Sequence, residues 1–402
     1  RPYDPERDFD AVVRTWREIG WIDTSDDQRA SLGHFLEVGH SAVGVVDGDA
    51  ECLVHWTPGT LRHTDTDLPL CGLTAVTTSR VARKLGLATA LTARALVEGI
   101  DAGAAVAVLG MFEQGFYDRF GFGTGPYEHR VRFDPRSLDV DMLYRPPVRV
   151  TPDDWEDVHA ALLRRHRDHG SLTLDPPGIA RAELGWIENP FGLGYRDESG
   201  ELTHFVMGPA KGEHGPYRIW HLAYRDTAQL LELLRMLREL GDQVASIDMM
   251  EPPEIQLQDL VRQPIRRRIM SAKSEHELTT TSLAFWQLRI LDLEACVAAH
   301  RWRGPEVVFD LTLDDPLGGL VDGAGIAGDY TVTVADPATV EPGHRGDVPR
   351  LRASVNAFSR LWFGVRSASA LAVTDDVAAP ADLLAALDES LRLPPPRLGW
   401  FI

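Results

Sequence analysis

The 402-residue sequence predicts a multidomain protein of mixed α/β and α+β class. Hydrophobic residues make up 44% of the chain, which is enough to bury more than one core. Between residues 70 and 103 an apolar strand, a polar turn and an amphipathic helix follow one another, and a strand-to-helix opening recurs after Pro147. From residue 285 onward the pattern changes again to strands followed by helices.

The first part of the chain carries a regular order of predicted elements. Apolar residues recur at helical spacing over residues 5–20, which predicts a helix. Asp47-Gly48 is a strong two-residue hairpin signal between two strand-like runs, and a polar turn is expected over residues 60–67. The later elements are predicted as a strand over 70–77, a helix to Gly103, a buried strand over 104–111 and a closing strand over 127–133.

The turn before the predicted helix is suited to binding a pyrophosphate. It reads Arg83-x-x-Gly86-x-Ala88, with Lys84 adding a second positive charge. A helix N-terminus offers unpaired N–H groups and a positive dipole end, and a glycine there lets a phosphate approach the backbone closely. An ordinary helix start remains the alternative for this motif taken alone.

Two stretches taken together resemble a known family. The spacing of Arg83, Gly86 and Ala88 is similar to the acyl-coenzyme A loop of the GNAT N-acetyltransferase superfamily. About thirty residues later, residues 115–123 place Tyr117 before an aromatic-glycine turn. This pair of motifs resembles the enhanced intracellular survival (Eis) acetyltransferases, which implies an acyltransferase that acetylates an amine.

The resemblance implies three domains and an assembly. Eis-type chains have about 400 residues and form hexamers of two stacked trimers. Pro146 and Pro147 mark a boundary, and Thr151 and Pro152 open a second unit as N-cap and first helical residue. The expected domains are a catalytic GNAT domain over residues 1–145, a second GNAT-like domain without the coenzyme A loop over 146–284, and a sterol-carrier-like domain over 285–402.

Acetyl-coenzyme A is the co-substrate that the resemblance implies, with no metal. Its pantetheine arm would meet the strand end, its pyrophosphate the loop and helix start, and its thiol end the residues after the next strand. Glu113 can equally be a helix-start acid, and Phe112 departs from the small polar residue expected there. The residues carried over are Val76, Thr77, Thr78, Arg83, Lys84, Leu85, Gly86, Leu87, Ala88, Thr89, Phe112 and Glu113.

Amine acetylation needs a base for the amine and an acid for the departing thiolate. Tyr117 stands where the family has its general acid, and packing beside the neighbouring phenylalanines is the alternative role. The base would be the carboxylate of Ile402, because in the Eis family the terminal carboxylate enters the active site. That family commonly ends in an aromatic residue, whereas this sequence ends in Trp400-Phe401-Ile402, so the register of the base stays open.

Charge and composition restrict the partners. The formal net charge of −19, from 60 acidic and 41 basic residues, argues against duplex nucleic acid. It favours cationic acceptors such as aminoglycosides, polyamines or lysine side chains if the acids line the cleft, with plain solubility as the alternative. The cysteines Cys52, Cys71 and Cys296 lack metal-type spacing, and the charged N-terminal stretch leads us to expect a cytoplasmic protein with no membrane segment.

Ligand choice is the least determined property of this sequence. The resemblance implies that the first helices and their connection form one wall of the amine pocket. A sterol-carrier-like domain usually has an apolar pocket, so a lipid-binding protein with a vestigial acetyltransferase is the main rival function. The residues expected on the wall are Trp16, Trp21, Asp23, Asp26, Asp27 and Phe35.

Overall fold

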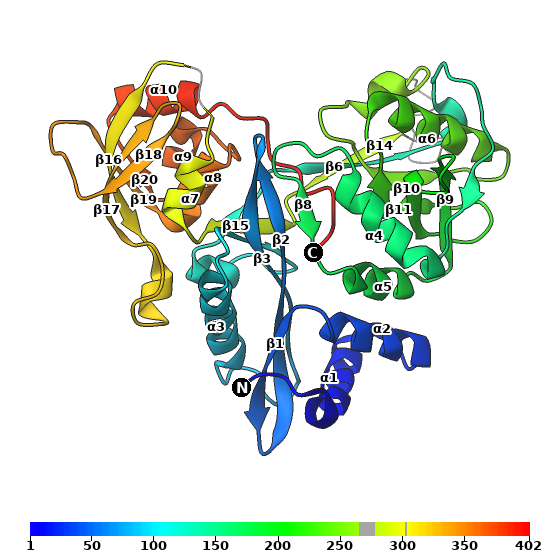
Figure 1. Cartoon of the computed structure of the whole chain (residues 1–402), viewed down its shortest axis with the longest axis horizontal. Helices are drawn as coiled ribbons and strands as arrows, with labels where there is room; N and C mark the ends of the chain where they lie inside the picture. The colour runs from blue at the N-terminus through cyan, green and yellow to red at the C-terminus, as the bar shows by residue number, and fades with distance from the viewer. Residues whose placement is uncertain (265–277, 302–303) are drawn as a thin grey trace.

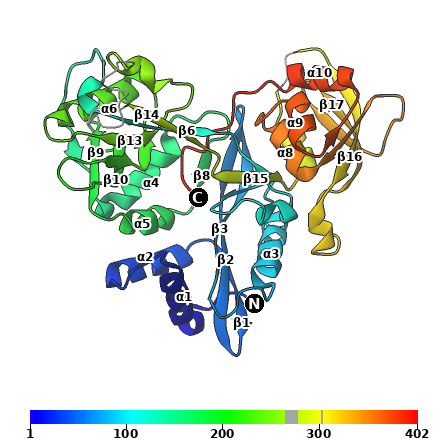
Figure 2. The same ribbon diagram turned by 180° about the vertical axis from the view of Figure 1, so that it is seen from behind.

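The computed structural model describes residues 1–264, 278–301 and 304–402, which form three lobes (Figure 1). The first lobe contains the central sheet. The first lobe, with the two longest strands, lies between the other two in both views (Figure 2). Its elements are α1 (Pro5–Ile19), α2 (Asp26–Leu36), β1 (His40–Val46), β2 (Asp49–His63), β3 (Thr66–Thr78), α3 (Leu87–Asp101), β4 (Val106–Gly110), η1 (Tyr117–Phe120) and β5 (Gly123–Thr124). β6 (Glu128–Phe133) and η2 (Pro135–Ser137) follow them and belong to the second lobe.

The central sheet is mixed, with strand order β1-β2-β3-β4-β15-β5. β3 and β4 run parallel, and α3 is the crossover helix between them. The sheet also recruits two strands from later in the sequence, β8 (Leu172–Leu174) beside β2 and β15 (Trp286–Ile290) beside β4. The central lobe is therefore completed by segments that lie far downstream.

The hairpin of β2 and β3 is longer than the sequence pattern predicts. A polar turn was expected over residues 60–67, but β2 continues to His63 and pairs with β3 down to His63 and Thr66. The turn is confined to Thr64 and Asp65, with Thr64 at a φ of 53°. The polar side chains misled the prediction, because Thr60 is hydrogen-bonded to Thr173 of β8 and His63 is buried.

The second lobe contains two smaller sheets, with strand orders β12-β10-β9-β7 and β11-β13-β6-β14. The sequence pattern over residues 217–224 predicts one strand, but the structure divides it at Trp220, since β11 pairs with β13 and β12 pairs with β10. Its elements are β7 (Val148–Arg149), η3 (Pro152–Asp154), α4 (Trp155–Arg164), α5 (Gly178–Gly185), β9 (Pro190–Arg196), β10 (Leu202–Pro209), β11 (Tyr217–Ile219), β12 (His221–Ala223), α6 (Thr227–Glu239), η4 (Leu240–Asp242), β13 (Ile247–Met250), η5 (Leu257–Leu260) and β14 (Thr279–Leu283).

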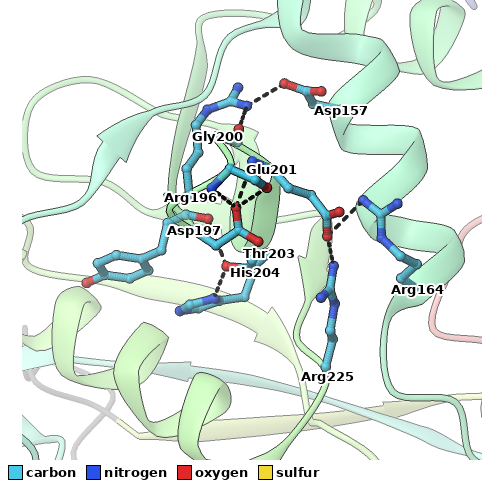
Figure 3. A network of polar contacts seen from close by, with 11 residues as sticks. Asp157, Arg164, Arg196, Asp197, Gly200, Glu201, Thr203, His204 and Arg225 are labelled. Carbon is cyan, nitrogen blue, oxygen red and sulfur yellow. Dashed lines mark hydrogen bonds and ion pairs between the residues drawn. The ribbon is translucent and has the colours of Figure 1, made fainter.

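A network of ion pairs fastens the β9–β10 hairpin to α4 (Figure 3). Arg196 pairs with Asp157 at 2.5 Å, and Glu201 pairs with Arg164 at 3.2 Å and with Arg225. Several of these side chains are only partly buried, so each pair contributes little alone and the value of the network lies in its geometry. It fixes the hairpin against the helix that follows the capping box of Thr151 and Asp154.

The third lobe is an α+β unit with strand order β18-β17-β16-β19-β20. The sequence pattern predicts helices over residues 354–363 and 380–391, and both form as α8 and α10. Most residues of α8 are buried, because it packs against β15 and β5 of the central sheet as well as β19 and β16. The elements are α7 (Leu293–Ala298), β16 (Val307–Asp314), η6 (Pro316–Gly319), β17 (Gly328–Val334), β18 (Thr339–Pro342), β19 (Arg350–Ser354), α8 (Val355–Trp362), α9 (Ala368–Thr374), β20 (Val377–Ala378) and α10 (Ala381–Ser390).

The sheets do not follow the expected chain divisions at residues 145 and 284. β6, predicted to close the first unit, pairs with β13 and β14 in the second lobe, whereas β15 returns to the central sheet. The lobes therefore exchange strands, and the division into domains stays a prediction. In the described part of the chain, no helix is both long enough and apolar enough to span a bilayer.

Three buried histidines lie together where the lobes meet. His63 Nε2 lies 3.3 Å from His300 Nδ1, and the His63 ring is also packed against His169. His169 donates from Nε2 to the Phe363 carbonyl and accepts at Nδ1 from the Thr64 N–H, an arrangement that requires the neutral ring. Burial lowers the pKa of all three imidazoles, that of His300 to about 4.

This cluster should make the fold sensitive to acid. The unfolded chain binds protons near the ordinary histidine pKa of about 6.5, whereas the folded cluster resists them, so stability should be lost as pH falls from about 6.5 toward the folded pKa of His300, about 4. When His300 is replaced by Gln, the free energy of unfolding should fall by on the order of 1–2 kcal/mol less over this pH range than in the wild type. Unfolding temperatures measured at several pH values, with the exposed His214→Gln as control, test this. An unchanged pH slope in the His300 variant would contradict it.

Candidate functional site

The site begins where two parallel strands of the central sheet separate. β3 and β4 pair from Leu70 and Val106 only as far as Leu73 and Leu109. β3 continues on β2 to Thr78, after a register shift beside Ala75, whose φ is 53°. The carboxyl ends of neighbouring parallel strands meet at one sheet edge, so the segments after β3 and β4 both open onto this gap.

The segment after β3 is the glycine-containing loop predicted to hold a pyrophosphate. Arg83, Lys84 and Leu85 are exposed, and Gly86 caps α3 with a φ of 79°. A Cβ placed on Gly86 would have no atom within 4 Å, so the space beside the first-turn amides of Leu87, Ala88 and Thr89 is open. No side chain of the described residues caps this helix end, which leaves those amides available to an anion.

The strand end leading into this loop also carries unused donors. Val76 and Thr78 are half-buried, while the hydroxyl groups of Thr77 and Ser79 are buried without a partner among the described residues. Buried hydroxyl groups without a partner cost free energy, which a ligand with polar atoms would recover. The arrangement fits a long ligand that runs along β3 and ends at the start of α3.

The segment after β4 brings Tyr117 to the same edge. Tyr117 opens η1 and is 3% exposed, packed edge-on against Phe116 and Phe122. Its hydroxyl group makes no hydrogen bond to the described residues and is therefore free to donate to a ligand. Burial, with a contribution from the Glu113 carboxylate, raises the pKa of Tyr117 to about 12.

Phe112 and Glu113 lie between β4 and η1, and both are exposed. The Phe112 ring contacts Trp21 edge-on, with ring centroids 6.3 Å apart. Both residues precede Tyr117 by only a few positions in the chain, and they lie at the same open edge of the sheet. Every predicted coenzyme residue lies on one of the two segments that leave this edge.

The last residues of the chain enter the gap from the opposite side. The segment after α10 crosses from the third lobe to β8 at the junction of the other two lobes (Figures 1 and 2). A Cβ on Gly110 would lie 2.4 Å from the Ile402 carboxyl oxygen, and one on Gly72 would lie 2.7 Å from Ile402 Cδ1. Ile402 therefore lies against one face of the sheet, over Gly72 of β3 and over Gly110 at the end of β4, and glycine is needed at both contacts.

Buried polar contacts hold this segment in place. The Leu172 N–H and the Arg165 guanidinium both donate to the Leu398 carbonyl, and Trp400 donates from Nε1 to Glu183 at 2.9 Å. Arg165 also donates to the carbonyls of Leu162 and Leu172 and has no carboxylate partner in the described residues. Burial lowers the pKa of Arg165 to about 9.

A cavity of about 460 Å³ adjoins Ile402. It lies between the central sheet, which contributes Thr57 and Thr74, and the second lobe, which contributes α5 and the strands β6, β11 and β13. Of the six residues expected on the pocket wall, only Phe35 lines this cavity. The aspartates Asp23, Asp26 and Asp27 do not, because they lie on the outer connection and the first turn of α2.

Sequence reasoning missed the polar residues of this cavity, notably Glu183, Arg130 and Arg218. They belong to the second lobe and have no motif of their own, so only the folded arrangement brings them beside Ile402. Among the described residues, no three His, Cys, Asp or Glu side chains gather closely enough to hold a metal ion.

Comparisons with known proteins identify an acetyltransferase domain in the first part of the chain. Residues 3–125 match the family of acetyltransferase (GNAT) domains. An uncharacterized N-acetyltransferase of Streptomyces avermitilis is 27% identical over 337 residues, covering 76% of this chain and 74% of that protein. A second uncharacterized N-acetyltransferase of the same organism is 30% identical over 190 residues, which cover 44% of this chain and 42% of that one.

Solved structures share the fold of the whole chain. A probable N-acyltransferase of Enterococcus faecalis superposes with a TM-score of 0.79 at 17% identity, covering 100% of this chain and 99% of that one. Eis1 from Mycobacterium abscessus superposes with a TM-score of 0.73 at 18% identity, covering 98% and 96%. The chain is therefore an acyltransferase with an N-terminal GNAT acetyltransferase domain, built on a whole-chain fold similar to that of Eis1.

Proposed function

We propose that the protein transfers the acetyl group of acetyl-coenzyme A to the amine of an acceptor bound in the 460 Å³ cavity. The observation that carries this proposal is the gap between β3 and β4. The predicted coenzyme loop and Tyr117 leave its edge on one side, and Ile402 and the cavity lie on the other. The two substrates would then meet at the gap, which is the positioning that a direct transfer requires.

The coenzyme side of the proposal rests on the open helix start. The first-turn amides of α3 and the exposed Arg83 and Lys84 would hold the pyrophosphate, while Val76, Thr77 and Thr78 would meet the pantetheine arm. Leu85 would border the coenzyme at its pyrophosphate end, and Glu113 would border it at its thiol end. The partnerless hydroxyl groups of Thr77 and Ser79 support a polar ligand along this strand end.

The chemistry follows from two groups of this chain. The Ile402 carboxylate would accept the proton that the acceptor ammonium must lose before its nitrogen forms the new C–N bond. As the C–S bond breaks, the Tyr117 hydroxyl would donate its proton to the departing sulfur, and the second proton that the nitrogen loses on becoming an amide would restore the phenol. The raised pKa keeps this phenol protonated throughout the working range, and its free hydroxyl needs no rearrangement to donate.

The remaining parts of the chain would form the scaffold of this site. We propose that residues 146–284 are a second GNAT-like domain without a coenzyme loop, and that residues 285–402 are a sterol-carrier-like domain that delivers Ile402. The division of β11 from β12 supports the first assignment, and the path of the last residues supports the second. We also propose a hexamer of two trimers, which light scattering would test.

Release of coenzyme A measures the proposed activity directly. The untagged protein should release thiol from acetyl-coenzyme A only when an amine is present. A panel of aminoglycosides, polyamines, lysine peptides and smaller apolar amines identifies the class of acceptor. Binding of acetyl-coenzyme A without release in any amine would contradict the transferase. Absence of binding would shift the assignment to lipid carriage by the third lobe.

Replacing Tyr117 by Phe should lower kcat by about 10²–10⁴-fold and leave the affinity for acetyl-coenzyme A nearly unchanged. The lost hydroxyl has no protein partner among the described residues, so packing and stability should be preserved. Steady-state kinetics and coenzyme titration measure the two effects. The exposed Tyr127→Phe is the matched control. Wild-type turnover in the Tyr117 variant would remove this residue from the mechanism.

Moving the carboxylate of Ile402 should suppress turnover. Adding Gly-Ser after Ile402 moves the terminal carboxylate away from the gap. Gly110→Ala places a methyl group 2.4 Å from the present position of the Ile402 carboxyl oxygen. Both variants should lose at least about tenfold in kcat while still binding acetyl-coenzyme A. Ile402→Val keeps the carboxylate and is the control. Full activity of the extended protein would show that another group is the base.

A further inference from the structure

The cavity beside Ile402 is mainly apolar. Its apolar lining residues include Phe35, Leu174, Ile179, Trp186, Trp220 and Met250. Such walls bind the body of a ligand by removing apolar surface from water. A hydrated sugar or an extended polyamine has little apolar surface to bury there, so the walls already favour a different type of acceptor.

An excess of positive charge lies on the strand wall of the cavity. Arg218 and Arg132 stand directly opposite Asp248 on the neighbouring strands, with Arg130 one diagonal step away. All three guanidinium groups share the carboxylate of Asp248, which binds Arg130 closely and lies 3.7 and 3.8 Å from the other two. Arg130 and Arg218 line the cavity, so donors remain available there for an anionic group.

The helix wall of the same cavity supplies a negative group. Glu183 of α5 lines the cavity, and Trp400 is its one hydrogen-bond donor among the described residues. A carboxylate can accept about four hydrogen bonds, so most of its capacity is unused. Burial raises the pKa of Glu183 to about 8, which means that a cation beside it would stabilise its charged form.

We propose that the acceptor is an amine whose apolar body also carries an anionic group. Its ammonium would lie at Glu183, close to Ile402, and its anionic group at Arg130 and Arg218. This inference rests on the proposed acetyl transfer and narrows its acceptor. A polycation would place a second positive charge against the arginine wall, where like charges repel. The net charge of −19 does not describe this cavity, whose strand wall is positive.

A matched series of acceptors tests the proposal. The aromatic amines para-(aminoethyl)benzoate, para-methylphenethylamine and para-(aminomethyl)phenethylamine share one skeleton and carry an anionic, a neutral and a cationic substituent. We expect kcat/KM to fall in that order, with the anion preferred over the cation by at least about tenfold. Equal rates, or a preference for the cation, would overturn the proposal. If no amine of any kind releases coenzyme A, the proposed function itself fails.

Arginine variants locate the preference. Arg218→Gln and Arg130→Gln should abolish the advantage of the carboxylate, so that kcat/KM for the anionic amine falls to that of para-methylphenethylamine measured on the same variant. Arg132→Gln removes the same charge from the same cluster but does not line the cavity, so it should keep the advantage. An equal loss in the Arg132 variant would show a long-range effect of charge and overturn the assigned contact.

Two variants separate binding of the ammonium from support of the chain end. Glu183→Gln still accepts the Trp400 hydrogen bond but loses its charge, so it should raise KM for all three amines. Trp400→Phe keeps the carboxylate and loses the hydrogen bond, so it should lower kcat without changing the order of the amines. If Glu183→Gln leaves KM unchanged, Glu183 only positions the chain end and the ammonium contact is wrong.

Discussion

The docking of the last residues against the face of the central sheet, where β3 and β4 separate, is the constraint on which the site depends. The pairing of these parallel strands stops at Leu73 and Leu109, and Ile402 lies over Gly72 and Gly110 beside the opening. The position is fixed by contacts further back, at Leu398 and Trp400. Because those contacts come from the second lobe, three parts of the chain must assemble correctly before the proposed base reaches the gap.

The sequence predicted the parts of this site that are local in the chain. The loop around Gly86 and the turn around Tyr117 each contain their own structural signal, and both form where expected. The predicted turn at residues 60–67 failed because the polar residues there pair with β8, a strand more than one hundred residues away. A local pattern cannot reveal a partner that only tertiary folding provides.

The cavity was beyond sequence reasoning for the same reason. Glu183, Arg130 and Arg218 lie on three separate elements, and no spacing along the chain relates them. The overall charge does not describe the cavity, since the acids expected on the pocket wall lie outside it. Net charge is a sum over the whole surface, whereas recognition depends on the few groups that face the ligand.

The junction that delivers the chain end also contains the cluster of three buried histidines, whose pKa values are lowered by burial. The His169 carbonyl accepts from the Arg397 N–H, and the His169 ring joins Thr64 of the central lobe to Phe363 of the third. One residue therefore links the stability of the lobe junction to the start of the segment that ends at Ile402. Protonation of that ring would break its hydrogen bond from Thr64 and weaken both together. In this fold, the interface between lobes and the geometry of the proposed base are parts of one structural unit.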